Sequence, residues 1–521
     1  MSTGRDRKYT ESLDMQDAEI IVIGSGIGGL TAGALLARYG RQVIICESHT
    51  IAGGAAHSFS RQGFQFDSGP SFYCGLGDPK SLNPLRQVLA VLGEAAPAIA
   101  YDPLGHYHFP EGAFPVYSNG ERYRQAVAEI TPQGAKELAA LEQRLLPLYN
   151  ALKEIPTLAL RADLSLLPVL FRRYPWPLLK LIPQLRTIQS SVGDIVDQTI
   201  RDPWVKRLID LECFLLSGLK AHETIAPEVA FMFGERSQSV VDYPIGGGGA
   251  IVDALVRGLQ RWGGELRLGT HVQQILVARN RAIGVRLRNG ETLRAPVVIS
   301  NASIWDTYSQ LLGPQDLPAA YRQTALKTPA VDSFMHLHLG IRAEGLSDLT
   351  IHHVVIHDAK QDISTPGNTC MISIPTVLDP QLAPPEHHLI HAYTLEPWAD
   401  WRRDQTYEFR KQKRAYPLFR ALEKIIPDLR SRIRLELIGS PLTHQHFLRR
   451  YQGAYGPAIA AGQGLFPNCH TPISGLYRVG DSTLPGIGVP AVAASGILCA
   501  NTLVSPRQTR ELLTTLAKGT P

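Results

Sequence analysis

The sequence predicts an α/β fold: a Rossmann-like nucleotide-binding domain with an interleaved α+β domain that contains an antiparallel sheet and helices. Three observations support this prediction. A short apolar strand runs into a glycine-rich turn at residues 20–29, a second strand ends at Glu47, and a strand followed by Asp481 and a helix lies near the C-terminus. At 521 residues the chain is too long for one compact core, so we expect two domains.

Residues 20–29, IIVIGSGIGG, form the strand and turn on which the first domain is built. The apolar, β-branched start is typical of a buried parallel strand. The G-x-G-x-x-G spacing that follows permits a tight turn, lets the backbone approach a pyrophosphate, and lets a helix over residues 28–39 pack on the strand. The predicted nucleotide contacts are Gly24, Gly26, Ile27, Gly28 and Gly29. The alternative is a doubly wound domain whose glycines only form a turn.

Glu47 indicates which nucleotide the first domain binds. The predicted strand over residues 42–46 ends directly before Glu47, which lies 18 residues after Gly29. At about this spacing a carboxylate accepts hydrogen bonds from a ribose diol. Because an acidic side chain disfavours the 2′-phosphate of NADP, we expect FAD or NAD.

The C-terminal segment adds a second signal. Residues 476–480, LYRVG, are predicted to form a strand, Asp481 follows it, and residues 491–503 are predicted to form a helix of small and apolar residues. A carboxylate at the end of such a strand can accept a hydrogen bond from a ribityl hydroxyl. The helix N-terminus behind Gly488 and Val489 would place positive charge near the N1–C2=O edge of a flavin.

Composition and charge exclude several other classes of protein. The net charge of +5 is mild, and no basic run interleaved with aromatic residues occurs, so we expect no nucleic-acid partner. The six cysteines form no C-x-x-C pair and no cluster with metal-ligand spacing, which favours buried, reduced thiols. Cys46 is expected in a buried strand and Cys499 in a buried helix.

Two segments bear on membranes and targeting. Residues 1–17 are polar and charged, unlike a secretory signal or a transit peptide, and no run of about 18 uncharged apolar residues exists to span a bilayer. Residues 164–185 are strongly apolar but carry four prolines, three basic residues, a tyrosine and a tryptophan. This pattern suits a segment that lies in a membrane interface. The alternative is an irregular helical hairpin packed on the protein's own core.

The rest of the chain alternates between the two domains. Residues 82–238 are expected to be helix-rich, residues 250–262 helical, and residues 265–285 to hold two short strands. Residues 334–339 and 389–394 alternate in polarity, which predicts an antiparallel sheet that forms a wall of a substrate cavity. His336 and His338 share a face of the first of these strands, but no acidic cluster accompanies them, so we expect no metal. The predicted nucleotide-binding domain comprises residues 1–80, 239–304 and 471–521, and the substrate domain residues 81–238 and 305–470.

Several motifs resemble one flavoprotein family. They are the glycine-rich turn with Glu47, the pair Gly53-Gly54, YPIGGGGAIVDALVRGL, VISNASIWDT, SIPTVLDPQLAP, the motif beginning at Thr443, and LYRVGDSTLPGIGVPAVAASG. Together they resemble the FAD-dependent oxidoreductase family of prolycopene-isomerase-like carotenoid isomerases and phytoene desaturases, over nearly the whole chain.

The resemblance implies non-covalently bound FAD, an apolar tunnel for a C40 carotenoid, and a cytoplasmic protein attached peripherally to a membrane, thylakoid or plasma membrane in a cyanobacterium. The resemblance also implies that a second loop, at Gly53 and Gly54, contacts the pyrophosphate, and that the backbone of one strand contacts the adenine. The further cofactor contacts that it implies are Ser48, Ala55, Val272 and Gly480.

Function remains open between three hypotheses. In isomerases of this family, reduced flavin assists rotation about a double bond without net redox change; in desaturases or saturases, electrons pass to or from an acceptor such as a quinone. A flavin- and carotenoid-binding protein without activity is the third. An amine oxidase would need a polar, aromatic-caged site that no motif indicates. Glu212 and Asp242 are candidate acid–base groups, because burial near a polyene would raise the pKa of a carboxyl group; the alternative is that both are ordinary helix or turn acids.

Overall fold

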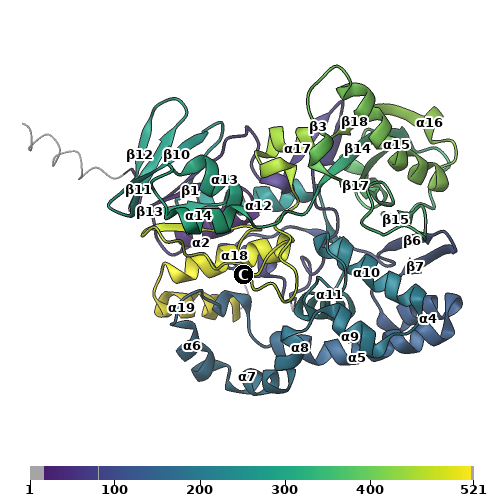
Figure 1. Cartoon of the computed structure of the whole chain (residues 1–521), viewed down its shortest axis with the longest axis horizontal. Coiled ribbons are helices and arrows are strands. Elements are labelled where there is room, and N and C mark those ends of the chain that lie inside the picture. Colours follow the sequence, from purple (N-terminus) through teal and green to yellow (C-terminus); the bar gives the residue numbers. More distant parts are fainter. Residues whose placement is uncertain (1–16, 80, 518–521) are drawn as a thin grey trace, which may run out of the picture.

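The computed structural model describes residues 17–79 and 81–517, so the polar segment over residues 1–16 lies outside the described residues. Two large sheets stand at opposite sides of the molecule in Figure 1, with a layer of helices below them. The smaller sheet contains β1 and lies beside α18, and the larger sheet contains β14 and lies beside α15. This arrangement is the expected α/β fold with an interleaved α+β part.

The smaller sheet is parallel and has five strands. Its hydrogen bonds join neighbours in the order β19, β13, β1, β2, β9, which differs from the order along the chain. The strands are β1 (Ile20–Ile23), β2 (Val43–Cys46), β9 (Glu265–Arg267), β13 (Val297–Ser300) and β19 (Leu476–Arg478). Residues from the start, middle and end of the chain therefore form one sheet, whose carboxyl ends meet at one edge.

Three helices that follow glycine-rich segments pack beside this sheet. α2 (Ile27–Arg38) contacts both α12 (Gly248–Arg261) and α18 (Val489–Thr502). These helices lie within about two residues of the predicted ones. α3 (Pro84–Leu92) and α19 (Pro506–Ala517) complete the packing. Cys46 and Cys499 are buried in β2 and α18, and all six cysteines are free.

The larger sheet has seven strands. The order is β18, β14, β17, β16, β15, β6, β7, and all neighbours are antiparallel except β15 and β6. The strands are β6 (Gly105–Phe109), β7 (Gly112–Val116), β14 (Ser333–Arg342), β15 (His352–Ile356), β16 (Thr369–Ser373), β17 (His387–Glu396) and β18 (Ile433–Gly439). The two alternating segments are strands, as predicted. β6 and β7 lie in the region that was expected to be helical, because short strands between polar turns resemble loops.

Helices cover the larger sheet on one side and extend below it. α15 (Tyr407–Ile425) shares an apolar core with β14, β16 and β17. A second core joins β6 and β7 to a helical layer that is visible below the sheet in Figure 1. That layer consists of α4 (Gly120–Ile130), α5 (Pro132–Leu152), α9 (Val192–Thr199), α10 (Pro203–Ser217) and α11 (Ala226–Gln238).

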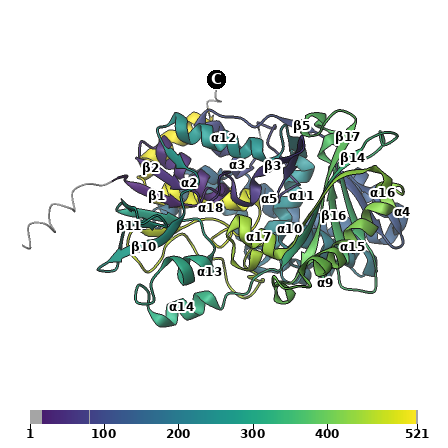
Figure 2. The same ribbon diagram turned by 90° about the horizontal axis from the view of Figure 1, so that it is seen from above.

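The smaller elements connect these layers, as the view from above in Figure 2 shows. The segment expected to hold two strands holds β9 and the hairpin of β10 (Val272–Ala278) and β11 (Arg281–Leu287), because a tight turn at residues 279–280 divides it. The remaining strands are β3 (Ser58–Arg61), β4 (Phe64–Asp67), β5 (Ala98–Ala100), β8 (Asp242–Pro244) and β12 (Thr292–Arg294). Short α-helices also occur here: α13 (Ile304–Asp306), α14 (Ala319–Leu326), α16 (Leu429–Arg432) and α17 (Pro441–Leu448).

The apolar segment over residues 164–185 forms short helices along the lower edge of the molecule in Figure 1. They are α6 (Leu166–Arg173), α7 (Pro175–Leu181), a 3₁₀ turn, and α8 (Leu185–Gln189), and within them only Pro177 is buried. The exposed large apolar side chains of this segment are Leu164, Leu167, Phe171, Trp176, Leu179, Ile182 and Leu185. In the described part of the chain, no helix has the length and apolarity to cross a membrane.

Candidate functional site

One large cavity of about 1460 Å³ lies between the two sheets. A pocket for a single small ligand measures roughly 300–1,000 Å³, so this cavity has room for a cofactor and a substrate. One end is formed by the glycine-rich loops at the edge of the parallel sheet, and the other by α10, α11 and the face of the seven-stranded sheet opposite α15.

The turn between β1 and α2 forms the first part of the cavity wall. Gly24, Gly26 and Ile27 line the cavity. Gly24 has a positive φ of 91°, and Gly26 caps α2 without any side-chain hydrogen bond to the helix N-terminus. The first N–H groups of α2 are therefore free to bind an anion such as a pyrophosphate.

Gly28 and Gly29 do not line the cavity but allow close packing around the turn. A Cβ on Gly29 would lie 2.2 Å from the carbonyl oxygen of Gly24. A Cβ on Gly28 would lie 2.9 Å from Asn301 Oδ1 and 2.9 Å from the backbone nitrogen of Gly480. Asn301, which directly follows β13, thus packs between the glycine-rich turn and the C-terminal segment.

Glu47 lines the cavity at the end of β2 and is nearly buried. Its Oε2 accepts hydrogen bonds from the N–H and the hydroxyl of Ser25, at 2.8 and 2.7 Å, and its Oε1 accepts one from the N–H of His49 at 2.8 Å. These bonds fix the carboxylate and the turn together. Ser48, the next residue, also lines the cavity.

The second glycine loop lies against the first. The N–H of Gly53 donates to the carbonyl of Ser25 at 3.1 Å, and Gly53 forms a parallel bridge with Gly26. Both Gly53 and Gly54 have positive φ, of 115° and 56°. Together with Ala55, they line the cavity beside the start of α2, where a dinucleotide pyrophosphate would lie.

The C-terminal segment forms a further part of the cavity wall. Gly480, Asp481, Gly488 and Val489 line the cavity there, and Val272 lines it at the start of β10. Asp481 forms an ion pair with Arg450 and accepts a hydrogen bond from the hydroxyl of Ser482 at 3.0 Å. Gly488 caps α18 with a φ of 101° and without a side-chain hydrogen bond to the helix N-terminus.

The predicted cofactor residues therefore surround one elongated space, apart from the packing glycines Gly28 and Gly29. Free helix N–H groups, a buried carboxylate and a second strand-end carboxylate thus lie on the wall of one cavity. Sequence reasoning missed Asn301 and Arg450. Asn301 could have been found from its place at the carboxyl end of β13, and Arg450 from the motif that begins at Thr443.

The far end of the cavity is mainly apolar. Its walls combine aromatic, aliphatic and sulfur-containing side chains from the helices and from the larger sheet. These residues include Phe214, Leu215, Leu216, Phe231, Met232, Phe334, Met371, Tyr393 and Tyr455. Such a surface suits a long hydrocarbon ligand.

Glu212 and Arg236 also line this end. Both are buried, and Arg236 Nη1 donates to Glu212 Oε1 at 2.9 Å. The hydroxyl of Tyr123 donates to the same oxygen at 2.9 Å. Glu212 is thus a member of a buried ion pair, an arrangement that the sequence did not indicate.

Asp242 lies behind the cavity wall. Its neighbour Val241 lines the cavity, whereas Asp242 does not. Asp242 Oδ2 accepts a hydrogen bond from the N–H of Gly77 at 2.7 Å, and Oδ1 has no partner among the described residues. Burial raises the pKa of Asp242, as expected, but the carboxyl group has no direct access to the cavity.

Comparisons with known proteins agree with this geometry. Residues 27–504 match the family described as flavin containing amine oxidoreductase. The chain is 35% identical to the chloroplastic prolycopene isomerase of Daucus carota, covering 96% of this chain and 80% of that protein. It is 27% identical to the neurosporene-forming phytoene desaturase of Rhodobacter capsulatus, covering 92% and 93%. A crystal structure of an oxidoreductase from Methanosarcina mazei has the same fold, with a TM-score of 0.60, 20% identity, and coverage of 92% and 98%.

Proposed function

The chain belongs to the flavin containing amine oxidoreductase family, and we propose that it is an FAD-dependent isomerase that acts on the double bonds of a carotenoid. One observation carries the proposal: the cavity that begins at the dinucleotide-binding loops continues without a break along apolar walls. The identity of about a third with plant prolycopene isomerases, over almost the whole chain, supports the substrate class.

We propose the following roles at the cofactor end. The N–H groups of α2 hold the pyrophosphate, Glu47 accepts hydrogen bonds from the adenosine ribose, and the backbone at Val272 contacts the adenine. Asp481 accepts a hydrogen bond from the ribityl chain, and the positive end of α18 stabilises negative charge on the ring system. When bound, a flavin supplies reversible transfer of electrons.

At the other end, the apolar walls exclude water and hold the hydrocarbon extended. Glu212 and Arg236 form an ion pair in this wall, so their two charges offset each other. Of the two predicted acid–base groups, Glu212 has access to the cavity. Asp242 can act only through its neighbours, since it lies behind the wall. We also propose that the domains divide as predicted, since the strands of each large sheet come from the segments assigned to one domain.

We further propose that residues 164–185 dock on a membrane surface, from which a carotenoid can enter. Seven large apolar side chains of this segment are exposed, while Arg172, Arg173 and Lys180 lie among them. Apolar side chains would enter the acyl boundary, and the basic groups would remain at the headgroups. The exposure argues against the alternative in which this segment packs on the protein's own core.

The decisive test is isomerisation without a change of mass. FAD-loaded protein is reduced under anaerobic conditions and incubated with prolycopene in liposomes. The products are separated by chromatography, and their molecular masses are measured by mass spectrometry. We expect the cis/trans ratio to change while the mass stays constant. An unchanged ratio in protein that retains its flavin would refute isomerase activity on this substrate.

A redox reaction is the second candidate, because the chain also resembles phytoene desaturases. The same incubation distinguishes it: a product that differs by two hydrogens, and that forms only with an electron acceptor such as a quinone, would assign the protein as a desaturase or saturase.

A further inference from the structure

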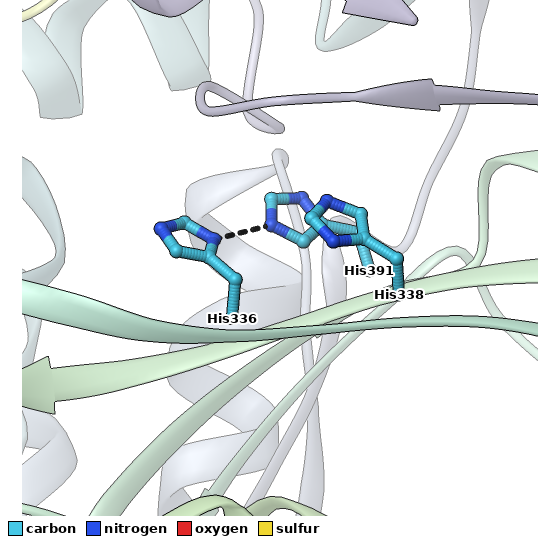
Figure 3. Close-up of side chains that lie close together, drawn as sticks. All are labelled: His336, His338 and His391. Atoms are coloured by element: carbon cyan, nitrogen blue, oxygen red, sulfur yellow. Dashed lines mark hydrogen bonds between the residues drawn. The ribbon is translucent and has the colours of Figure 1, made fainter. Parts of the chain in front are cut away.

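Three buried histidines meet on the cavity side of the seven-stranded sheet, as Figure 3 shows. His336 and His338 lie two residues apart on β14, and His391 lies on β17 directly opposite His338 in the strand register. Since alternate residues of a strand share a face, the pairing brings all three rings together. The relative exposure of these residues is 4%, 6% and 1%.

The ring nitrogens are close enough to share one ion. One nitrogen of each histidine lies within 4.8 Å of those of the other two. His336 Nδ1 and His391 Nε2 are 2.9 Å apart. The two atoms share a hydrogen bond at this distance. Ligand nitrogens at roughly 2.0–2.1 Å from one tetrahedral ion lie about 3.3 Å apart, so a shift of a few tenths of an ångström lets an ion replace the shared proton.

The surroundings of His338 prepare it for coordination. Its Nε2 lies 3.1 Å from the carbonyl oxygen of Asp67, which can only accept a hydrogen bond. Nε2 therefore carries the proton, and the lone pair lies on Nδ1. A histidine that ligates a metal commonly donates its other N–H to a backbone carbonyl in this way.

Two other ring nitrogens have no partner. His336 Nε2 and His391 Nδ1 are buried and lack a hydrogen bond within the described residues. They lie on the far side of each ring from the 2.9 Å pair, so they carry the ring proton when His336 Nδ1 and His391 Nε2 ligate an ion. His336 also lines the large cavity, as does His444, whose ring stacks on that of His336 at 4.5 Å.

We propose that His336, His338 and His391 bind one divalent transition-metal ion of the zinc or iron(II) type, with an open coordination position toward the cavity. Three imidazoles are a sufficient ligand set for such ions, so the acidic residues that the sequence lacks here are not required. The rings of His338 and His391 are stacked. On binding the ion they rotate about their Cβ–Cγ bonds, a soft torsion, so that a lone pair of each ring points at the ion.

The test measures metal binding by the FAD-loaded protein, independently of activity. Metal-free protein is titrated with Zn²⁺ in competition with a chromophoric chelator, and bound metal is counted by mass spectrometry after gel filtration. We expect one Zn²⁺ per chain and a loss of affinity of more than about 100-fold in His391→Ala and His338→Gln. His388→Gln is the matched control: His388 lies on the same strand, but its Nδ1 contacts Thr376 Oγ1 at 3.0 Å, and we expect unchanged affinity.

Absence of Zn²⁺ binding to the unaltered protein would overturn the proposal, as would binding that survives replacement of His336 and His391. Retention of the flavin shows that each variant is folded. X-ray absorption of the Zn²⁺-loaded protein needs no variant at all, and fewer than three imidazole ligands would also overturn the assignment. A loss of binding in His353→Gln with His391→Ala unaffected would place the ion at another histidine group and refute this site.

Discussion

The exposed apolar segment over residues 164–185 gives a prediction whose size follows from the structure. Phe171, Trp176 and Leu179 are 67%, 73% and 52% exposed. Replacement of all three with serine removes apolar surface that contacts only solvent in the free protein. We therefore expect the triple variant to fold normally and to bind membranes far more weakly.

The magnitude comes from the area that remains available. Complete burial of a large apolar side chain contributes about 1.5–3 kcal/mol. With half to three quarters of each side chain still exposed, the contribution on docking is about 1–2 kcal/mol per residue, or about 3–6 kcal/mol for the three. At 1.4 kcal/mol per tenfold change, membrane partitioning should fall by about 10²–10⁴-fold.

The assay is sedimentation with liposomes, with and without anionic lipid, at two salt concentrations. The matched control replaces Phe409 and Tyr416 with serine, since these side chains are 74% and 56% exposed on α15, which lies away from α6 and α7 in Figure 1. We expect the control to sediment like the unaltered protein. An equal loss in the control, or no loss in the triple variant, would refute the docking of this segment.

Three further predictions concern the cofactor site, a buried ion pair and pH. Gly28→Ala should lose most of its flavin absorbance on purification, because the new Cβ would lie 2.9 Å from two polar groups. The control Gly120→Ala should retain it, because Gly120 has no positive φ and the nearest atom, at 3.2 Å, is the flexible end of Arg124. Glu212→Gln should lower the free energy of unfolding by about 3–5 kcal/mol in urea, because it leaves Arg236 buried without an anion, and the double variant with Arg236→Met should recover part of the loss. Burial raises the pKa of Glu228 from 4.5 to about 7, so its contribution to stability is present below pH 4.5 and is lost as the pH rises through 7. The wild type should therefore lose about 3 kcal/mol of unfolding free energy relative to Glu228→Gln over that pH range. A difference between the two proteins that stays constant with pH would contradict this.

Local patterns predicted the strand and helix that flank the glycine-rich turn. The strand Ile20–Ile23 has the predicted bounds, and α2 begins one residue before the predicted start. Such features follow from neighbouring residues: β-branched residues favour the strand, and glycine spacing decides where the chain turns. The acidic residue at the end of β2 was also found from spacing alone.

The parts that were missed depend on pairing between distant segments. The ion pair of Arg450 with Asp481 joins residues 31 positions apart, and His391 approaches His336 across 55 positions. Each contact requires the register of strands and loops, which local periodicity does not contain. Similarly, the hairpin of β6 and β7 is stabilised by its partner β15, far along the chain.

The order of strands in the parallel sheet has a consequence for biosynthesis. β13 is an exposed parallel edge until β19 pairs with it, and the groove beside α2 is open until α18 packs there. Because residues 476–502 leave the ribosome after the other strands of this sheet, a nascent chain cannot complete the cofactor site before they emerge. Until then the unpaired edge is a hazard for aggregation, and flavin supply during expression should determine the yield of folded protein.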